Sequence, residues 1–330
     1  MRLRPLALLS TVAAATLILT GCTGSPDAEK TPEPTSSAES GNCLVDAKPG
    51  AGSDAVQVEG SGLDAKITVP AGTKMENIER TVLKKGEGKD VAAGDLISIR
   101  YQIVDASTNK VLETSERGPD GALPVLLDPA NAQQQEIFDS TQSPIFIAAA
   151  ECMPLGSEAV LVLPGAGDQS PVVIYLQTIA GLPTTATGSD VEPPAGMATV
   201  KLDKDGVPTI TVPQTDPPAE TTIGLLKKGD GATVGAGDLV TVQYLGVTWA
   251  DGKEFDSSWS RGAAPTQFLT SRVVPGFTKA LEGQQVGSQV LVEIPPADGY
   301  GDKDNGAIPA NSTLVFVIDI LATTPLMTAG

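Results

Sequence analysis

The chain of 330 residues contains no histidine, and its three cysteines, Cys22, Cys43 and Cys152, show no CxxC spacing. The lack of histidine excludes His-ligated metal sites, Ser-His-Asp catalysis and a histidine general base. Without paired cysteines at short spacing, a zinc or redox motif is not expected either. We therefore predict a protein that uses no metal and no cofactor.

Basic residues are also scarce, since 22 Lys and Arg stand against 40 Asp and Glu, for a formal net charge of −18. No basic patch stands out that could neutralise a phosphate backbone, so nucleic acid is not an expected partner. The excess negative charge is compatible with a soluble, solvated surface.

Aromatic residues are few, and eight of the twelve lie between Tyr244 and Phe316. Pockets for small molecules and peptides are commonly built from such side chains together with a few polar groups. The alternative is that this cluster fills an ordinary core.

The first 42 residues are typical of an exported, tethered protein. Residues 1–21 combine a basic start with a short apolar run, as a signal peptide does, and the run is marginal for a membrane span of ~20 residues. The segment ending at Cys22 (LTGC) resembles a bacterial lipobox, which implies cleavage before Cys22 and lipid attachment to its sulfur. An ordinary secretory signal with a chance cysteine is the alternative. Residues 22–42 are polar and rich in Pro and Ser, so we expect a flexible, disordered tether.

Lipid on Cys22 would anchor the protein at the outer face of the cell membrane. Export places the two other cysteines in an oxidising compartment. We hypothesise a disulfide between Cys43 and Cys152, with two buried free thiols as the alternative.

An internal repeat organises the rest of the chain. Three motifs recur at an offset of 143 residues: ITVP at 67 and 210, LKKG at 83 and 226, and a tyrosine at 101 and 244. A later block, 149–164, recurs at 280–295 with an offset of 131. We therefore predict two homologous domains, 43–182 and 196–325, joined by a linker at 183–195.

Local patterns within the second copy favour an α+β fold. Residues 239–244, 289–294 and 314–321 are β-branched or alternating and predict strands, and residues 250–253 (ADGK) predict a hairpin turn. A short helix should begin at Pro275 and close near Gly283. One helix on an antiparallel sheet is the expected design of each domain.

Several motifs in residues 221–322 together resemble the FKBP-type peptidyl-prolyl cis–trans isomerases. They are VQY at 242, DGKEFDSS at 251, VVPGF at 273, YG at 300, IP at 308 and LVF at 314. The resemblance implies two FKBP-like domains, each with an antiparallel sheet wrapped around a short helix. It also implies proline-containing polypeptides as substrates and a macrolide as a candidate ligand.

Carried over by position, the resemblance implies a pocket for a prolyl ring. Phe277 would form its floor, where the best-known members have tryptophan. Its walls would be Tyr244, Phe255, Val274 and Phe316. Asp256 would lie at the rim, Tyr300 would donate a hydrogen bond to a substrate carbonyl, and the backbone N–H of Ile308 would bind the carbonyl next to the proline.

Three other aromatic residues of the cluster have less definite roles. We expect Phe268 to be a core residue. Trp249 and Trp259 have no firm counterpart in the family. Trp259 is equally compatible with the rim of the pocket, with a partner contact or with a partly exposed structural position.

The first copy departs from the family more strongly. It keeps Tyr101 and places Phe146 opposite Phe277, but Leu112-Glu113 stands opposite Phe255-Asp256, and Ile174 opposite Phe316. We predict that this copy has the fold without useful catalysis and acts as a spacer, a dimer or client-binding surface, or a support.

The expected function is that of a membrane-anchored, extracytoplasmic prolyl isomerase that assists the folding of exported proteins, with its active site in the second domain. The alternative is a non-catalytic FKBP-like lipoprotein that binds a client or partner. The enzyme is favoured because one copy keeps the pocket residues that the other has lost.

Overall fold

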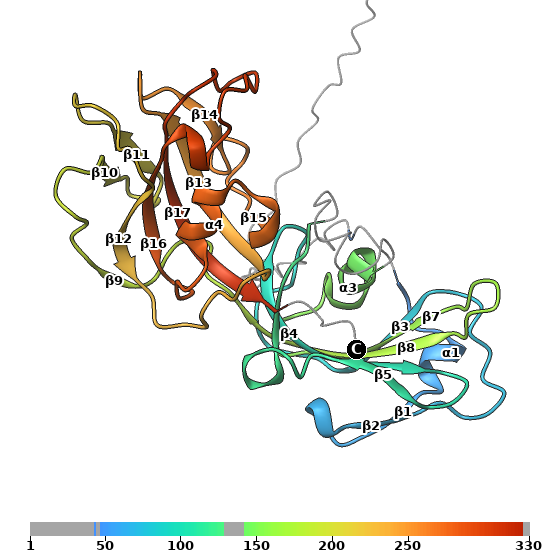
Figure 1. Ribbon diagram of the computed structural model, residues 1–330. Coiled ribbons are helices and arrows are strands. Elements are labelled where there is room, and N and C mark those ends of the chain that lie inside the picture. The colour runs from blue at the N-terminus through green and yellow to red at the C-terminus, as the bar shows by residue number, and fades with distance from the viewer. Residues whose placement is uncertain (1–42, 44–46, 129–141, 326–330) are drawn as a thin grey trace, which may run out of the picture. The chain divides into compact units, whose positions relative to one another are not determined.

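The computed structural model describes residue 43, residues 47–128 and residues 142–325 (Figure 1). The predicted signal peptide, Cys22 and the tether lie outside these residues. Within the described part of the chain, no helix combines the length and apolarity that crossing a membrane requires.

The first repeat forms a six-stranded antiparallel sheet in the order β3-β7-β8-β4-β5, with β6 also paired to β4. A two-stranded hairpin, β1–β2, precedes it. The bounds are β1 Gln57–Glu59, β2 Lys66–Thr68, β3 Glu79–Lys84, β4 Leu96–Asp105, β5 Val111–Thr114, β6 Leu123–Leu126, β7 Glu158–Leu163 and β8 Val172–Gly181.

The second repeat forms the corresponding sheet in the order β14-β13-β17-β16-β12-β9, with β15 paired to β13. Its own hairpin, β10–β11, follows β9 and precedes the other strands of the sheet. The bounds are β9 Ser189–Asp190, β10 Thr199–Leu202, β11 Pro208–Thr211, β12 Thr222–Lys228, β13 Leu239–Thr248, β14 Glu254–Ser257, β15 Thr266–Leu269, β16 Gln289–Ile294 and β17 Leu314–Thr324. The strands, the repeat and the turn at 250–253 are as the sequence predicts.

Among the described residues, each sheet carries one principal helix, α3 (Gln142–Ala150) in the first repeat and α4 (Pro275–Leu281) in the second. Helix α4 begins with Pro275, and the missing N–H of proline costs no hydrogen bond there because N–H groups of the first turn have no acceptor within the helix. Gly283 follows the end of the helix with a φ of +81°. The predicted α+β fold is confirmed. The remaining helical turns are α1 Ala51–Asp54, η1 Gly62–Asp64, η2 Pro119–Gly121, η3 Thr270–Arg272 and η4 Pro296–Asp298.

Both faces of the second sheet are buried, as the alternation along β17 shows. Phe316 and Ile318 pack with α4 in one apolar cluster, whereas Val315 and Val317 belong to a separate cluster on the opposite face. Successive side chains of a strand point to opposite faces, so each strand contributes to two cores.

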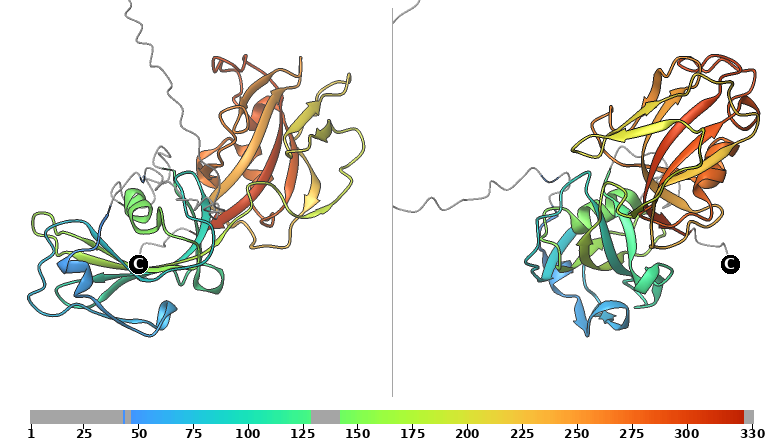
Figure 2. Two further views of the ribbon diagram at one scale, coloured as in Figure 1. Left: turned by 180° about the vertical axis from the view of Figure 1, so that it is seen from behind. Right: turned by 90° about the vertical axis from the view of Figure 1, so that its left-hand side faces the viewer.

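The opposite face is covered by the hairpin that precedes each sheet. In the second repeat, the hairpin β10–β11, drawn in yellow, lies beside the sheet (Figure 2). Ile210 of β11 and Met197 pack there together with Trp249 and Trp259. In the first repeat, Ile67 of β2 and Met75 pack in the same way against outward residues of β7 and β8. Of the alternatives left open for Trp259, the structural position is the one observed, because the residue is 9% exposed and packs on the face of the sheet opposite the pocket.

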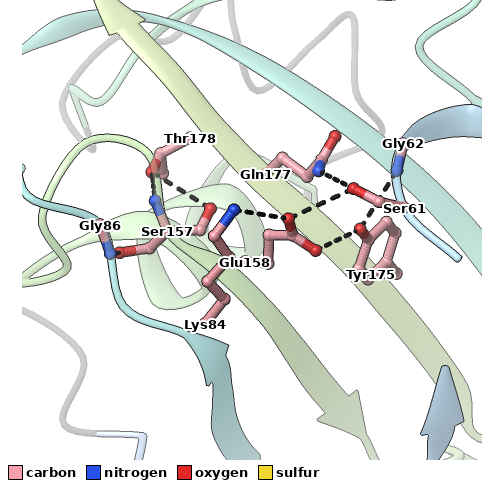
Figure 3. A network of polar contacts seen from close by, with 9 residues as sticks. All are labelled: Ser61, Gly62, Lys84, Gly86, Ser157, Glu158, Tyr175, Gln177 and Thr178. Atoms are coloured by element: carbon pink, nitrogen blue, oxygen red, sulfur yellow. Dashed lines mark hydrogen bonds and ion pairs between the residues drawn. The ribbon is translucent and has the colours of Figure 1, made fainter.

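The hairpin of the first repeat is also held by a polar network (Figure 3). Ser61 and Gly62, from the loop between β1 and β2, bond to Glu158 and Tyr175 of the sheet at 3.2 and 3.3 Å. Tyr175 in turn donates to the second Glu158 oxygen at 2.8 Å. The carboxylate therefore joins hairpin and sheet.

In the second repeat, the equivalent cross-strand pair has exchanged its acid and its amide. Glu158 faces Gln177 in the first sheet, while Gln289 faces Asp319 in the second. Asp319 accepts hydrogen bonds from the backbone N–H of Ala186 at 2.8 Å and from Gln289 at 2.7 Å. The segment predicted as a linker is therefore fastened to the second sheet, and it also supplies β9.

Cys43 and Cys152 are joined by a disulfide, with their Cα atoms 6.1 Å apart. Cys152 lies two residues after the last residue of α3. The bond therefore ties the beginning of the described chain to the helix of the first domain.

Candidate active site

A pocket of about 450 Å³ opens between α4 and the inner face of the second sheet. Its volume falls within the range typical of ligand sites. Seven of the residues predicted for the site line it together with three others, and the ten are Tyr244, Phe255, Asp256, Phe268, Arg272, Val273, Val274, Phe277, Tyr300 and Phe316. The eighth predicted residue, Ile308, lies in the adjoining core with 4% of its surface exposed.

The apolar part of the pocket is a set of aromatic rings in edge-to-face contact. The ring of Phe316 lies 5.1 Å from Phe277 and 5.3 Å from Phe255, at interplanar angles of 84° and 87°. Tyr244 closes the group at 6.2 Å from Phe277. Such contacts add to the burial energy and hold each ring in one orientation, so the pocket is preformed.

A glycine on β13 makes this packing possible. A Cβ atom on Gly246 would lie 2.6 Å from Phe255 Cζ and 2.7 Å from Phe316 Cε1, closer than carbon atoms can approach. Any side chain at this position would therefore push the two rings apart or fill the space between them. Gly246 lies two residues after Tyr244, on the same face of the strand.

The mouth of the pocket carries a polar triad of Tyr244, Asp256 and Arg261. The tyrosine hydroxyl donates to Asp256, and Arg261 both pairs with that carboxylate and donates to the hydroxyl at 2.9 Å. The guanidinium carbon also lies 5.5 Å from the centre of the Tyr244 ring. These contacts fix the direction of the Asp256 carboxylate at the rim.

One hydrogen-bond donor predicted to bind a substrate carbonyl has no partner among the described residues. The side chain of Tyr300 is 37% exposed and its hydroxyl makes no hydrogen bond there. The other predicted donor, the N–H of Ile308, faces the carbonyl of Asn305 in an isolated antiparallel bridge, in which the Ile308 carbonyl accepts from the N–H of Asn305 at 2.9 Å, so it is not left unpaired. Donors left unpaired at a pocket are available to a ligand.

The structure adds residues that the sequence interpretation missed. Phe268 lines the pocket and contacts Tyr244 at 5.5 Å, so it belongs to the site as well as to the core. Gly246 and Arg261 were not singled out either. The repeat holds a signal for Gly246, because Ile103 stands at the offset of 143, whereas Arg117 is one residue out of that offset from Arg261 and is matched to it only by its contacts.

The first domain retains the polar triad. Tyr101 donates to Glu113 at 2.5 Å, and Arg117 binds Glu113 at 3.1 Å and the Tyr101 hydroxyl at 3.2 Å. Burial and the adjacent Glu113 raise the pKa of Tyr101 far above its usual value. Phe146 lies 4.8 Å from Tyr101, as the alignment with Phe277 predicts.

The apolar half of the first site is different. Ile103 replaces Gly246 and is paired with Ile174, in the register in which Gly246 is paired with Phe316. The Ile103 side chain is 9% exposed within the core that contains Tyr101 and Phe146. Leu112, opposite Phe255, is 54% exposed. The Ile103 side chain thus occupies the space that Gly246 leaves free of a side chain in the second domain.

Comparison with known proteins identifies the class to which this fold and pocket belong. The family model described as FKBP-type peptidyl-prolyl cis–trans isomerase matches residues 231–321. An FK506-binding protein of Streptomyces anulatus is 38% identical over 119 residues, which cover 35% of this chain and 95% of that protein. A probable FK506-binding protein of Corynebacterium glutamicum is 36% identical over 115 residues, covering 35% of this chain and 97% of the relative.

A longer relative, the isomerase FkpA of Escherichia coli, is 40% identical over 101 residues, covering 31% of this chain and 37% of FkpA. The chain therefore belongs to the FKBP-type peptidyl-prolyl cis–trans isomerase family. It is by that relationship an enzyme of the prolyl isomerase class.

Proposed function

We propose that the protein is a lipid-anchored, extracytoplasmic prolyl isomerase whose active site is the pocket of the second domain. The observation that carries the proposal is the open aromatic pocket beside the unbonded hydroxyl of Tyr300. Uncatalysed rotation about an X-Pro bond takes tens of seconds or more, which is slow enough to limit folding. Exported proteins with proline residues are the proposed clients.

The chemistry requires no nucleophile. Rotation must break the resonance that keeps the amide planar, against a barrier of ~18–20 kcal/mol. The planar amide has more charge separation than the twisted one, so a dry aromatic pocket favours the twisted form relative to water. The Tyr300 hydroxyl would hold a neighbouring carbonyl while the bond rotates.

The assignment to the second domain can be tested with matched substitutions in both domains of the full chain. Phe255→Ala and Asp256→Leu should each lower kcat/KM on X-Pro peptides by about tenfold to a hundredfold. Leu112→Ala and Glu113→Leu, at the equivalent positions of the first domain, should leave it unchanged. Equal losses in both domains would contradict the assignment, and no acceleration by the unmodified chain on several X-Pro peptides would favour a non-catalytic binding protein.

The lipid anchor is tested separately through Cys22. Cys22→Ser should move the protein from the membrane fraction to the soluble fraction and abolish incorporation of labelled fatty acid. A variant that is still acylated, or still in the membrane fraction, would refute the anchor and leave the assignment of the pocket untouched.

A further inference from the structure

A cavity larger than the proline pocket lies elsewhere in the second domain. It has a volume of about 610 Å³ and lies between residues 213–217, residues 248–253 and residues 307–313, and we call it the back cleft. We infer that the back cleft binds a second, extended stretch of the same client polypeptide whose proline occupies the pocket. This inference rests on the proposed isomerase function and adds a site to it.

The walls of the back cleft are held together by Trp249. Its indole N–H donates to the carbonyl of Thr215 at 3.2 Å, and its backbone N–H donates to the carbonyl of Thr313 at 2.9 Å. One buried residue thus connects the segment after β11, the β13–β14 turn and the loop before β17. The cleft is fixed before any ligand arrives, which lowers the entropic cost of binding.

The lining has the chemistry of a polypeptide site. Pro213, Pro217 and Pro309 supply apolar surface, and Gln214, Thr215 and Asn311 supply amide and hydroxyl groups. Among the described residues, the side chains of these three polar residues make no hydrogen bond, so they can pair with peptide N–H and C=O groups. Charge is balanced, because the two charged side chains of the lining are Asp251 and Lys253. A neutral, amide-rich cleft fits an extended chain better than an ionic ligand.

The occupant is assigned to the client because one loop serves both sites. Ile308 turns its side chain into the core beside the proline pocket, while its neighbours Ala307 and Pro309 line the back cleft. Ile308 packs in the same cluster as the pocket residues Tyr244, Phe277 and Phe316, so a client that leaves the pocket on this side passes along the loop that forms one wall of the cleft. An extended chain advances about 3.3 Å per residue, so about six flanking residues span ~20 Å.

The experiment compares a short blocked X-Pro peptide with a peptide extended by about six residues on each side of the proline. Thr215→Phe places a ring in the cleft and keeps the backbone carbonyl that binds Trp249. Thr209→Phe is the matched control, because Thr209 is an exposed threonine of β11 that does not line the cleft. Both changes are made in the full chain.

We expect Thr215→Phe to lower kcat/KM for the long peptide by about tenfold and to leave the short peptide unchanged. Thr209→Phe should alter neither. The inference is overturned if the long peptide is turned over no better than the short one, or if Thr215→Phe slows both equally.

Binding gives a readout that does not depend on catalysis. In a Trp259→Phe background, Trp249 is the single tryptophan, and its fluorescence should respond to a long peptide in which alanine replaces the proline. Loss of that response in Thr215→Phe would support binding of the peptide in the back cleft. If the protein binds the peptide in this way but isomerises no peptide, only the isomerase proposal is refuted. The inference is overturned if the fluorescence does not respond to the peptide. It is also overturned if the protein instead self-associates through the cleft and Thr215→Phe abolishes that self-association.

Discussion

The mouth of the pocket is nearly the same in the two domains, while the rings behind it differ. Tyr244, Asp256 and Arg261 of the second domain correspond to Tyr101, Glu113 and Arg117 of the first, with the same pattern of contacts. Both tyrosines are further fixed by a serine that bonds to their backbone N–H, at 2.9 Å from Ser258 and 3.0 Å from Ser115.

This comparison separates what the fold needs from what the pocket needs. The triad joins β4 to the segment after β5 in one domain and β13 to the segment after β14 in the other, so it stabilises the same corner of each sheet. The pocket depends instead on Gly246, Phe255 and Phe316, which the first domain replaces with Ile103, Leu112 and Ile174. A retained triad is therefore weak evidence for catalysis.

The largest expected effect on stability comes from removing the disulfide of the first domain. Cys43→Ser together with Cys152→Ser opens a loop with a sequence separation of 109, which should lower the free energy of unfolding of that domain by about 4 kcal/mol. Urea denaturation should show this as an earlier first transition, while peptide isomerisation is retained. Cys22→Ser is the control and should not change the transition. Loss of isomerisation in the double variant would show that the second domain depends on the first.

Gly246→Ile would convert the second pocket to the pattern of the first. We expect kcat/KM on X-Pro peptides to fall about a hundredfold, equivalent to about 2.7 kcal/mol, because the side chain would occupy the space between Phe255 and Phe316. Val247→Ile, on the opposite face of β13, is the control and should retain activity, with circular dichroism confirming that both variants fold. Unchanged activity in a folded Gly246→Ile protein would contradict the importance of the open position.

Tyr244→Phe tests the triad alone. Loss of the hydroxyl removes the contact that orients Asp256 and Arg261. We therefore expect kcat/KM to fall about tenfold. Tyr101→Phe should leave activity unchanged and cost about 1 kcal/mol of stability, as expected for one hydrogen bond. Equal activity losses from the two substitutions would show that the first site also contributes to turnover.

The smallest expected effect concerns the pH dependence of stability. Burial raises the pKa of Asp319 above its usual value, against the hydrogen bonds from Ala186 and Gln289, which lower it. Because the folded-state pKa is the higher one, this group's contribution is fully present below its unfolded pKa of about 3.9 and is lost as pH rises through the folded value. Between the pH values that equal these two pKa values, the melting temperature of Asp319→Asn should therefore change less with pH than that of the unmodified protein. Ser61→Ala, in the network of the first domain, is the control, and an identical pH profile in Asp319→Asn would refute the prediction.

Much of the fold could be predicted from local pattern and from the repeat. The strand at 314–321 and the helix at 275–281 follow from β-branched alternation and from a proline at the start of a short apolar segment. The resemblance to the family identified seven residues that line the pocket. The position of Trp259 was left open because its neighbours in sequence give no sign that a hairpin from residues 199–211 covers that face of the sheet.

The sequence by itself determined the repeated α+β architecture and the loss of Phe255 and Phe316 equivalents from the first copy. These features depend on residue type and period, which can be seen without coordinates. The tertiary structure alone decided that Gly246 opens the pocket, that two tryptophans lie in a second core and that one loop borders both the pocket and the back cleft. The physical reason is that close approach and burial are properties of segments distant in sequence, and period and composition do not encode them.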